Sequence, residues 1–99
     1  MADLSMAELI HESSTHVASR DGVEYRVWVM GQQREDGSWH GWIEFHPDSS
    51  GPVLVTGRET TQVSRGALHY WAGGLEPIYF DGALARAQPI TTPSRVRVL

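Results

Sequence analysis

The stretch that most constrains the fold of this chain is a pair of alternating, aromatic-rich segments separated by a short turn sequence. Between residues 23 and 45, VEYRVWVMGQQ and SWHGWIEF flank REDG. Alternation with a period of two is typical of β-strands, and an Asp-Gly pair between two such runs indicates a hairpin. Apolar residues occur at both odd and even positions of each segment, so both faces of the hairpin carry apolar side chains. A chain of 99 residues has material for one modest core, and we expect a single α+β domain over residues 1–99.

The number of residues in the turn decides which side chains share a face. A two-residue turn would place Val29 opposite Glu44, so that apolar and charged side chains would share one face of the hairpin. A three-residue loop, with Gly37 left-handed and a bulge beside it, would place Val29 opposite Ile43 instead. We therefore expect the three-residue loop. The aliphatic core face that follows consists of Val27, Val29, Ile43 and Phe45.

The same register places a second set of side chains on the opposite face of the hairpin. Its centre is aromatic and its rim is polar, and its members are Arg26, Trp28, Met30, His40, Trp42, Glu44 and His46. Tryptophan, methionine and arginine are enriched at protein interfaces. We predict that this face binds a partner, either a second copy in a homodimer or another protein, through Trp28, Met30, Trp42 and Arg26. Two alternatives stay open: another segment of the chain covers this face, or the Trp side is the main core.

A third strand and a main helix are expected after the hairpin. A loop rich in Pro and Ser leads to a short strand over 53–56. Apolar residues then recur at spacings of three and four, which predicts a helix over 57–74 packed on the core face. The apolar residues are Val63, Ala67, Leu68, Trp71 and Leu75. Thr56 and Thr60 are both suitable caps, so the helix start stays open. The expected sheet is an antiparallel meander of three strands, or of four if residues 15–19 join it.

The two ends of the chain, residues 1–14 and 88–99, are expected to be peripheral or partly flexible. Residues 1–14 have the pattern of a short amphipathic turn of helix. A short second helix is expected over 76–87, with Pro77 at a permitted first-turn position, although a strand is the alternative for its first part. The sequence Arg95-Val96-Arg97-Val98-Leu99 alternates and could add an edge strand, in its own chain or in another.

Composition narrows the classes of function. The chain has 12 acidic and 8 basic residues, a net charge of −4 and no lysine, so nonspecific binding to nucleic acid is disfavoured. The absence of cysteine excludes disulfides, thiolate metal sites and cysteine nucleophiles, and indicates a reducing cytoplasm. The first residues do not follow the pattern of a secretory signal, and no apolar run approaches the roughly 20 residues of a membrane span. We therefore expect a soluble cytoplasmic protein with no membrane partner.

Polar groups on the aromatic face offer an alternative function. Glu44 and His46 lie two residues apart on one strand and project in the same direction, with Arg26 expected opposite His46. These three residues could line a pocket with aromatic walls, in a small-molecule-binding protein or an enzyme. No nucleophile or cofactor motif accompanies them, and His40 lies ~20 Å from His46 along the strand, too far to share a metal ion. We predict no catalytic residue, cofactor or metal site, and keep the pocket as the alternative.

From the hairpin turn onward, the order of landmarks resembles the HicB-like antitoxin fold. The landmarks are Asp36-Gly37 at the turn, Pro47-Asp48-x-x-Gly51, Gly57 after a short strand, Thr60 or Thr61, and a helix containing Ala67 and Leu68. The resemblance covers residues 23–73. It departs from the pattern in its longer strand before Pro47 and in Gln62, Ser64 and Arg65, which stand where acidic residues are expected. No DNA-binding module follows. The resemblance implies a noncatalytic β-β-β-α module that dimerises or occludes a partner protein.

Overall fold

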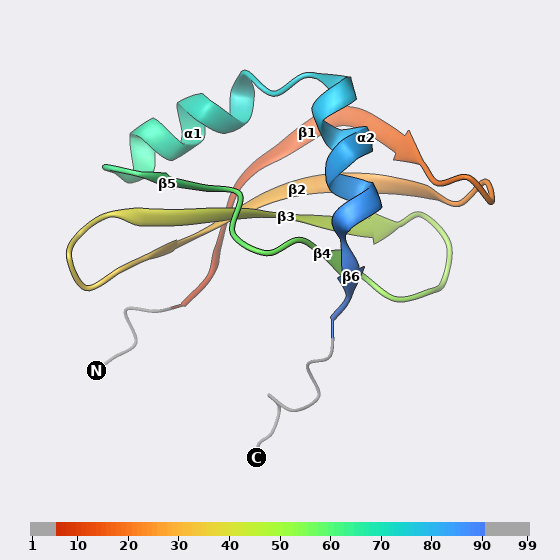
Figure 1. Ribbon diagram of the computed structural model, residues 1–99, viewed down its shortest axis with the longest axis horizontal. Helices are drawn as coiled ribbons and strands as arrows, with labels where there is room; N and C mark the ends of the chain where they lie inside the picture. The colour runs from red at the N-terminus through yellow and green to blue at the C-terminus, as the bar shows by residue number, and fades with distance from the viewer. Residues whose placement is uncertain (1–5, 91–99) are drawn as a thin grey trace, which may run out of the picture.

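An antiparallel sheet carries two helices on one of its faces (Figure 1). The computed structural model describes residues 6–90, and their elements are β1 (Glu8–Ala18), β2 (Glu24–Gln33), β3 (Trp39–Pro47), β4 (Leu54–Val55), β5 (Thr60–Gln62), α1 (Arg65–Gly73), α2 (Pro77–Arg86) and β6 (Gln88–Pro89). The strands lie in the order β1-β2-β3-β4-β6, and β5 pairs with a different part of β3 from β4. The fold is α+β with an antiparallel sheet, as expected. Within residues 6–90 the sheet has six strands, where three or four were expected, because β5 and β6 are only three and two residues long.

The β2–β3 hairpin has the register predicted from the parity of its side chains. Val29 is the direct cross-strand partner of Ile43, and Val27 is the partner of Phe45. All four side chains are fully buried beneath the helices. The aliphatic face is therefore the core face of the sheet, and the alternative in which the tryptophan side is the main core is wrong.

The hairpin turn has three residues, as the parity of the strands requires. The Arg34 N–H donates to the Ser38 carbonyl at 2.8 Å, and the Gly37 N–H donates to the Arg34 carbonyl at 2.9 Å. Gly37 has a φ of +90°, which strains any residue with a Cβ. Hydrogen bonds from the Ser38 hydroxyl and N–H hold the Asp36 carboxylate and lower its pKa.

Two glycines let α1 approach the sheet closely. Gly31 and Gly41 are cross-strand partners in the hairpin. Leu68 of α1 is fully buried over them, and a Cβ added at either glycine would lie 2.6 Å from a Leu68 methyl carbon. The buried residues around this contact are Ile10, Trp39 and Leu68, and those of the main core are Val17, Tyr25, Val27, Val29, Ile43, Phe45, Ala72, Phe80 and Ala83. Both helices thus pack on one face of the sheet.

The helix expected near the start of the chain is wrong from residue 8 onward, where the structure has strand β1. Residues 1–5 lie outside the described part of the chain. β1 pairs with β2, but its register shifts between Leu9 and His11 and again between Glu12 and His16. The first shift inserts one extra residue and moves the following side chains to the other face, whereas the second inserts two and leaves the faces unchanged. The alternation typical of a strand is therefore hidden in this sequence.

The main helix begins later than expected. Residues 60–62 form β5, which pairs with β3, and α1 begins at Arg65. Its cap is Ser64, whose hydroxyl accepts a hydrogen bond from the Ala67 N–H at 3.0 Å, so neither expected threonine is the cap. Val63, predicted on the apolar stripe, lies before the helix and is 83% exposed. The apolar spacing predicted that residues 60–62 belong to the first turns of the helix. They form backbone hydrogen bonds with β3 instead.

The second helix is confirmed, as α2. Pro77 lies in its first turn, where a missing N–H costs no hydrogen bond, and Phe80 is buried in the core. After α2, Gln88 and Pro89 form β6 on the far side of β4, within the end of the chain that was expected to be peripheral or partly flexible. The edge strand predicted over residues 95–99 lies outside the described residues.

Candidate functional site

The face of the sheet opposite the helices is the main candidate for a functional surface, and we call it the open face. By register, its members on β1, β2 and β3 are Leu9, Glu12, His16, Arg26, Trp28, Met30, Gln32, His40, Trp42, Glu44 and His46. No helix of the described chain lies over it (Figure 1). Its side chains are half-buried or exposed, whereas their neighbours on the core face are buried. The open face, with its aromatic centre, is therefore not covered by either described helix.

The structure places all four predicted partner-binding residues on the open face. Met30 is the cross-strand partner of Trp42, and Trp28 and Arg26 follow on the same side of β2. The indole Nε1 of Trp28 is buried and has no hydrogen-bond partner within residues 6–90. A buried donor without an acceptor costs about 1–3 kcal/mol. The centre of the open face thus has an unmet hydrogen-bonding requirement.

His46 and Glu44 form a close pair beside Trp28. The His46 ring stacks on the Trp28 ring with centroids 3.9 Å apart and a tilt of 32°. His46 Nε2 lies 3.0 Å from Glu44 Oε1, and the two side chains are only 18% and 17% exposed. A protonated imidazole here would form both an ion pair and a cation–π contact. Two of the three residues of the alternative ligand site are therefore in contact.

Arg26, the third residue of the alternative site, forms ion pairs with residues outside that site. Its guanidinium lies 4.0 Å from a Glu12 oxygen and 3.8 Å from an Asp48 oxygen. These three side chains are about half-exposed, so such ion pairs add little to stability. Arg26 thus belongs to a polar rim between two carboxylates.

His40 lies on the open face near the hairpin turn, apart from His46. Burial first, and then the positive charges of Arg34 and Arg58, lower the pKa of His40. The lowered pKa favours the neutral form of the His40 imidazole. Within residues 6–90, no group of three or more His, Asp or Glu side chains is arranged to hold a metal ion.

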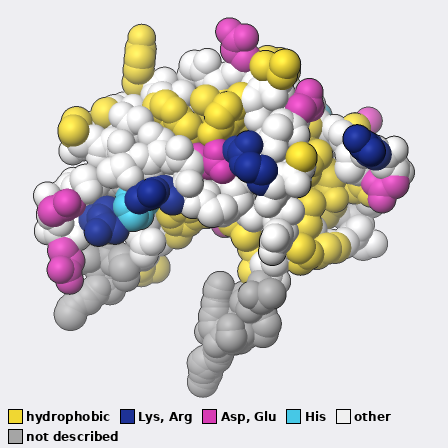
Figure 2. Space-filling model, in the orientation of Figure 1, with side chains coloured by type: hydrophobic (Ala, Val, Ile, Leu, Met, Phe, Trp, Pro, Cys, Tyr) yellow, Lys and Arg dark blue, Asp and Glu magenta, His cyan; other side chains and the backbone are white. Residues whose placement is uncertain are grey.

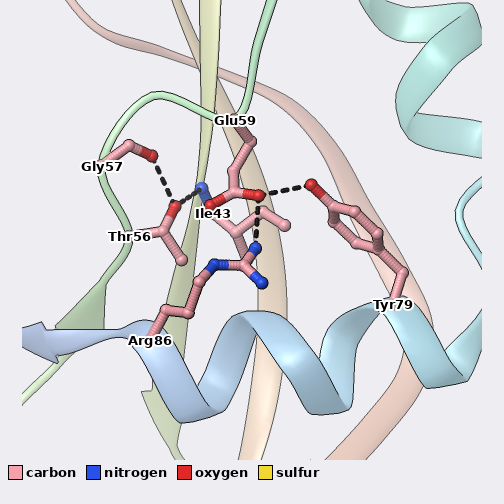
Figure 3. A network of polar contacts seen from close by, with 6 residues as sticks. All are labelled: Ile43, Thr56, Gly57, Glu59, Tyr79 and Arg86. Atoms are coloured by element: carbon pink, nitrogen blue, oxygen red, sulfur yellow. Dashed lines mark hydrogen bonds and ion pairs between the residues drawn. The ribbon is translucent and has the colours of Figure 1, made fainter.

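A polar cluster that sequence reasoning missed joins α2 to the loop before β5 (Figure 3). The carboxylate of Glu59, whose side chain is 9% exposed, accepts hydrogen bonds from the Tyr79 hydroxyl and from Arg86 Nη2, the latter at 2.5 Å. The Glu59 N–H also donates to the Gly41 carbonyl at 2.8 Å. Burial first, and then the Glu59 carboxylate, raise the pKa of Tyr79 to about 12. The cluster fastens α2 to the sheet.

The loop that carries Glu59 is itself held by Thr56. The buried Thr56 hydroxyl accepts from the Ile43 N–H at 3.1 Å and donates to the Gly57 carbonyl at 2.8 Å (Figure 3). Glu59 lies 20 residues from Tyr79 and 27 from Arg86 along the chain. No local spacing pattern relates residues so far apart, so the sequence carried no signal for this cluster.

A second contact missed at the sequence level fastens α1 to β1. The rings of His11 and His69 meet edge to face, with centroids 5.7 Å apart. Next to them, Arg65 Nε donates to Glu8 Oε1 at 2.9 Å. Arg65 and His69 are one helical turn apart and so share a side of α1. These two histidines therefore have a packing role between the elements.

Comparisons with protein-family models, with curated proteins and with solved structures found no match to this chain. We therefore infer function from its own residues. Neither described helix has the length and apolar character needed to cross a membrane. On the view shown in Figure 2, hydrophobic, acidic and basic side chains are interspersed, with no single charge sign covering the surface.

Proposed function

We propose that this chain is a noncatalytic interaction module that forms a homodimer through the open face. The observation that carries the proposal is the half-buried aromatic centre formed by Trp28, Met30 and Trp42 on a face that no described helix covers. Removing apolar surface from water contributes roughly 25 cal/mol per Å². Tryptophan and methionine offer much of that surface, and a second copy brings the same residues.

The unpaired indole of Trp28 supports the same proposal. Its buried N–H lacks an acceptor within the described chain, and the neighbouring His46 and Glu44 already contact each other. If the side chains that cover this atom rearrange on association, an incoming backbone or side chain could supply that acceptor. We include a cytoplasmic location in the proposal, because a chain without cysteine is suited to a reducing compartment. The HicB-like resemblance is a further part of the proposal, since it implies a module of this kind.

Sedimentation velocity of the full chain at tens of micromolar tests the homodimer. We expect a dimer for the wild type and a monomer for Trp42→Arg, which places a charge at the centre of the open face. Tyr70→Arg is the matched control, because Tyr70 is an aromatic residue on α1 that is 86% exposed. The control should remain a dimer, and circular dichroism should show that both variants are folded. A monomeric wild type would refute the homodimer.

A small-molecule site is the second candidate, and one observation favours it. His46 is within hydrogen-bond distance of Glu44 and stacks on Trp28, so an imidazole, a carboxylate and an aromatic wall lie together. A thermal-shift screen of a small-molecule library tests this candidate. Binding of a hit should be lost in His46→Ala and in Glu44→Gln. The candidate fails if every stabilising compound binds both variants as it binds the wild type.

A further inference from the structure

The rim of the open face beside Arg26 carries an excess of negative charge. The carboxylates of Glu12 and Asp48 both lie near the guanidinium of Arg26 and keep 46% and 44% of their side chains exposed, while Arg34 lies beside His40 near the hairpin turn. In a two-fold dimer the same face occurs on both subunits. Two open faces packed directly on each other would place these carboxylates on both sides of one interface, which is unfavourable unless cations offset their charge. A basic segment between the subunits would offset that charge.

The chain contains such a segment beyond the described residues. Residues 91–99 read TTPSRVRVL, with two of the eight basic residues of the chain and no acidic residue. Valine and leucine match the apolar centre of the open face. The long arginine side chains can reach carboxylates at its rim. The segment and the face are therefore complementary in both charge and hydropathy.

The described chain ends beside the open face. The Ile90 N–H donates to the Val53 carbonyl at 3.0 Å, and β6 follows β4 and β3 in the sheet. Gln88 is aligned with Val55, which is aligned with Glu44. Gln88 is thus two strand spacings from Glu44, a distance of about 10 Å. Nine extended residues span roughly 30 Å. Residues 91–99 are therefore long enough to cross a whole open face.

The direction of β6 favours the face of a second subunit. β6 is antiparallel to β4, and β4 is antiparallel to β3, so β6 runs parallel to β3. At Ile90 the chain therefore runs toward the Pro47 end of β3 and away from Trp42. To reach the centre of its own open face, the segment would have to reverse at once.

We propose that residues 91–99 of each subunit bind the open face of the other subunit. The proposal rests on the homodimer proposed above and names what holds it together. The valines pack on the aromatic centre, and the arginines pair with Glu12 and Asp48. Each subunit contributes one segment and binds one segment, so the exchange is reciprocal and produces a closed dimer.

Charge reversal in the full chain tests the exchange. Arg95→Glu with Arg97→Glu should weaken the dimer by about tenfold or more at 150 mM salt, because like charges then meet at the rim. The matched control is Arg20→Glu with Arg65→Glu, which changes the net charge equally at two exposed arginines that are not on the open face. The control should change the dissociation constant by less than about threefold. Sedimentation velocity over a concentration series gives both values.

A rescue variant makes the test specific for the proposed partners. In the Arg95→Glu, Arg97→Glu background, Glu12→Arg with Asp48→Arg should restore most of the lost affinity, since opposite charges again face each other. A synthetic peptide of residues 91–99 should also dissociate the wild-type dimer, while a scrambled peptide should not. These two results would be difficult to obtain from a general effect of net charge.

The outcomes separate this inference from the homodimer itself. If the wild type is a dimer and Arg95→Glu with Arg97→Glu behaves like the control, the exchange is refuted and the homodimer stands. If the wild type is a monomer at tens of micromolar, both are refuted. A dimer that weakens with the charge reversal and recovers with the rescue supports the exchange.

Discussion

At the scale of single residues, the stability of the fold depends on a few positions where one added methyl group or one lost hydrogen bond should be destabilising. Gly31 and Gly41 leave room for Leu68, and Gly37 adopts a backbone conformation that side chains disfavour. Glu59 is nine-tenths buried and is satisfied by two donors on one oxygen. A buried carboxylate is tolerated only when it is paired and hydrogen-bonded. These residues define where substitutions should have their largest effects.

The contact between Gly41 and Leu68 predicts the effect of one added methyl group. Gly41→Ala should lower the free energy of unfolding by about 1–3 kcal/mol, because Leu68 is fully buried and cannot give way freely. Gly57→Ala is the control, since a Cβ at Gly57 meets nothing within 4 Å. Urea denaturation measures both. Equal effects for the two substitutions would contradict the close packing of α1 on the sheet.

The raised pKa of Tyr79 predicts a loss of stability at high pH. The neutral hydroxyl donates to Glu59, and the folded-state pKa is about 12 against an ordinary value of 10.0. A group whose pKa is raised on folding contributes stability below its unfolded pKa and loses it as pH rises through the folded pKa. The contribution of Tyr79 should therefore be complete below pH 10 and decline up to pH 12.

The variant Tyr79→Phe isolates this contribution. The difference in the free energy of unfolding between wild type and Tyr79→Phe should be constant from pH 7 to 9 and shrink between pH 10 and 12. Urea denaturation at each pH provides the values. Tyr70→Phe is the control, because Tyr70 is exposed on α1. A difference that does not change with pH would argue against the Glu59 hydrogen bond.

At the scale of elements, local signals compete with backbone pairing. Residues 60–62 carry part of a helical spacing pattern, yet they pair with β3 and delay α1 to Arg65. β1 lies at one end of the described sheet order, and two register shifts interrupt it. Bulges in an edge strand discourage pairing with other chains. The irregularity that hides β1 in the sequence thus protects this edge of the sheet.

The late start of α1 predicts which hydroxyl stabilises the helix. Ser64→Ala should lower the free energy of unfolding by about 1 kcal/mol, because the Ala67 N–H loses its acceptor. Ser50→Ala, in the exposed loop before β4, should change it by less than about 0.5 kcal/mol. Thermal and urea denaturation can resolve this difference. An unchanged stability in Ser64→Ala would place the helix start elsewhere.

At the scale of the whole molecule, two layers leave one side of the sheet without a helix. α1 and α2 both cover the core face, and the described chain has no third helix for the open face (Figure 1). A small domain buries a limited share of its surface, so subunit association is an efficient way to bury more. The proposed homodimer and the proposed exchange of residues 91–99 both rest on this arrangement.

Association through the open face predicts that stability depends on protein concentration. Unfolding of a dimer releases two chains, so the melting temperature should rise as the concentration of the wild type rises. Trp42→Arg should abolish that dependence, while Tyr70→Arg should retain it. Differential scanning calorimetry over a hundredfold range of concentration measures the effect. A melting temperature independent of concentration in the wild type would contradict a dimer linked to folding.

By itself, the sequence determined the β2–β3 hairpin, its three-residue turn and its two faces, and it indicated α2 while leaving a strand as the alternative for its first part. These features depend on alternation, on turn residues and on helical spacing, which act between near neighbours in the chain. Only the tertiary structure decided the late start of α1, the irregular strand β1 and the partners of Glu59. Those features depend on contacts between residues far apart in the chain, where hydrogen bonding to β2, β3 and α2 overrides local preference.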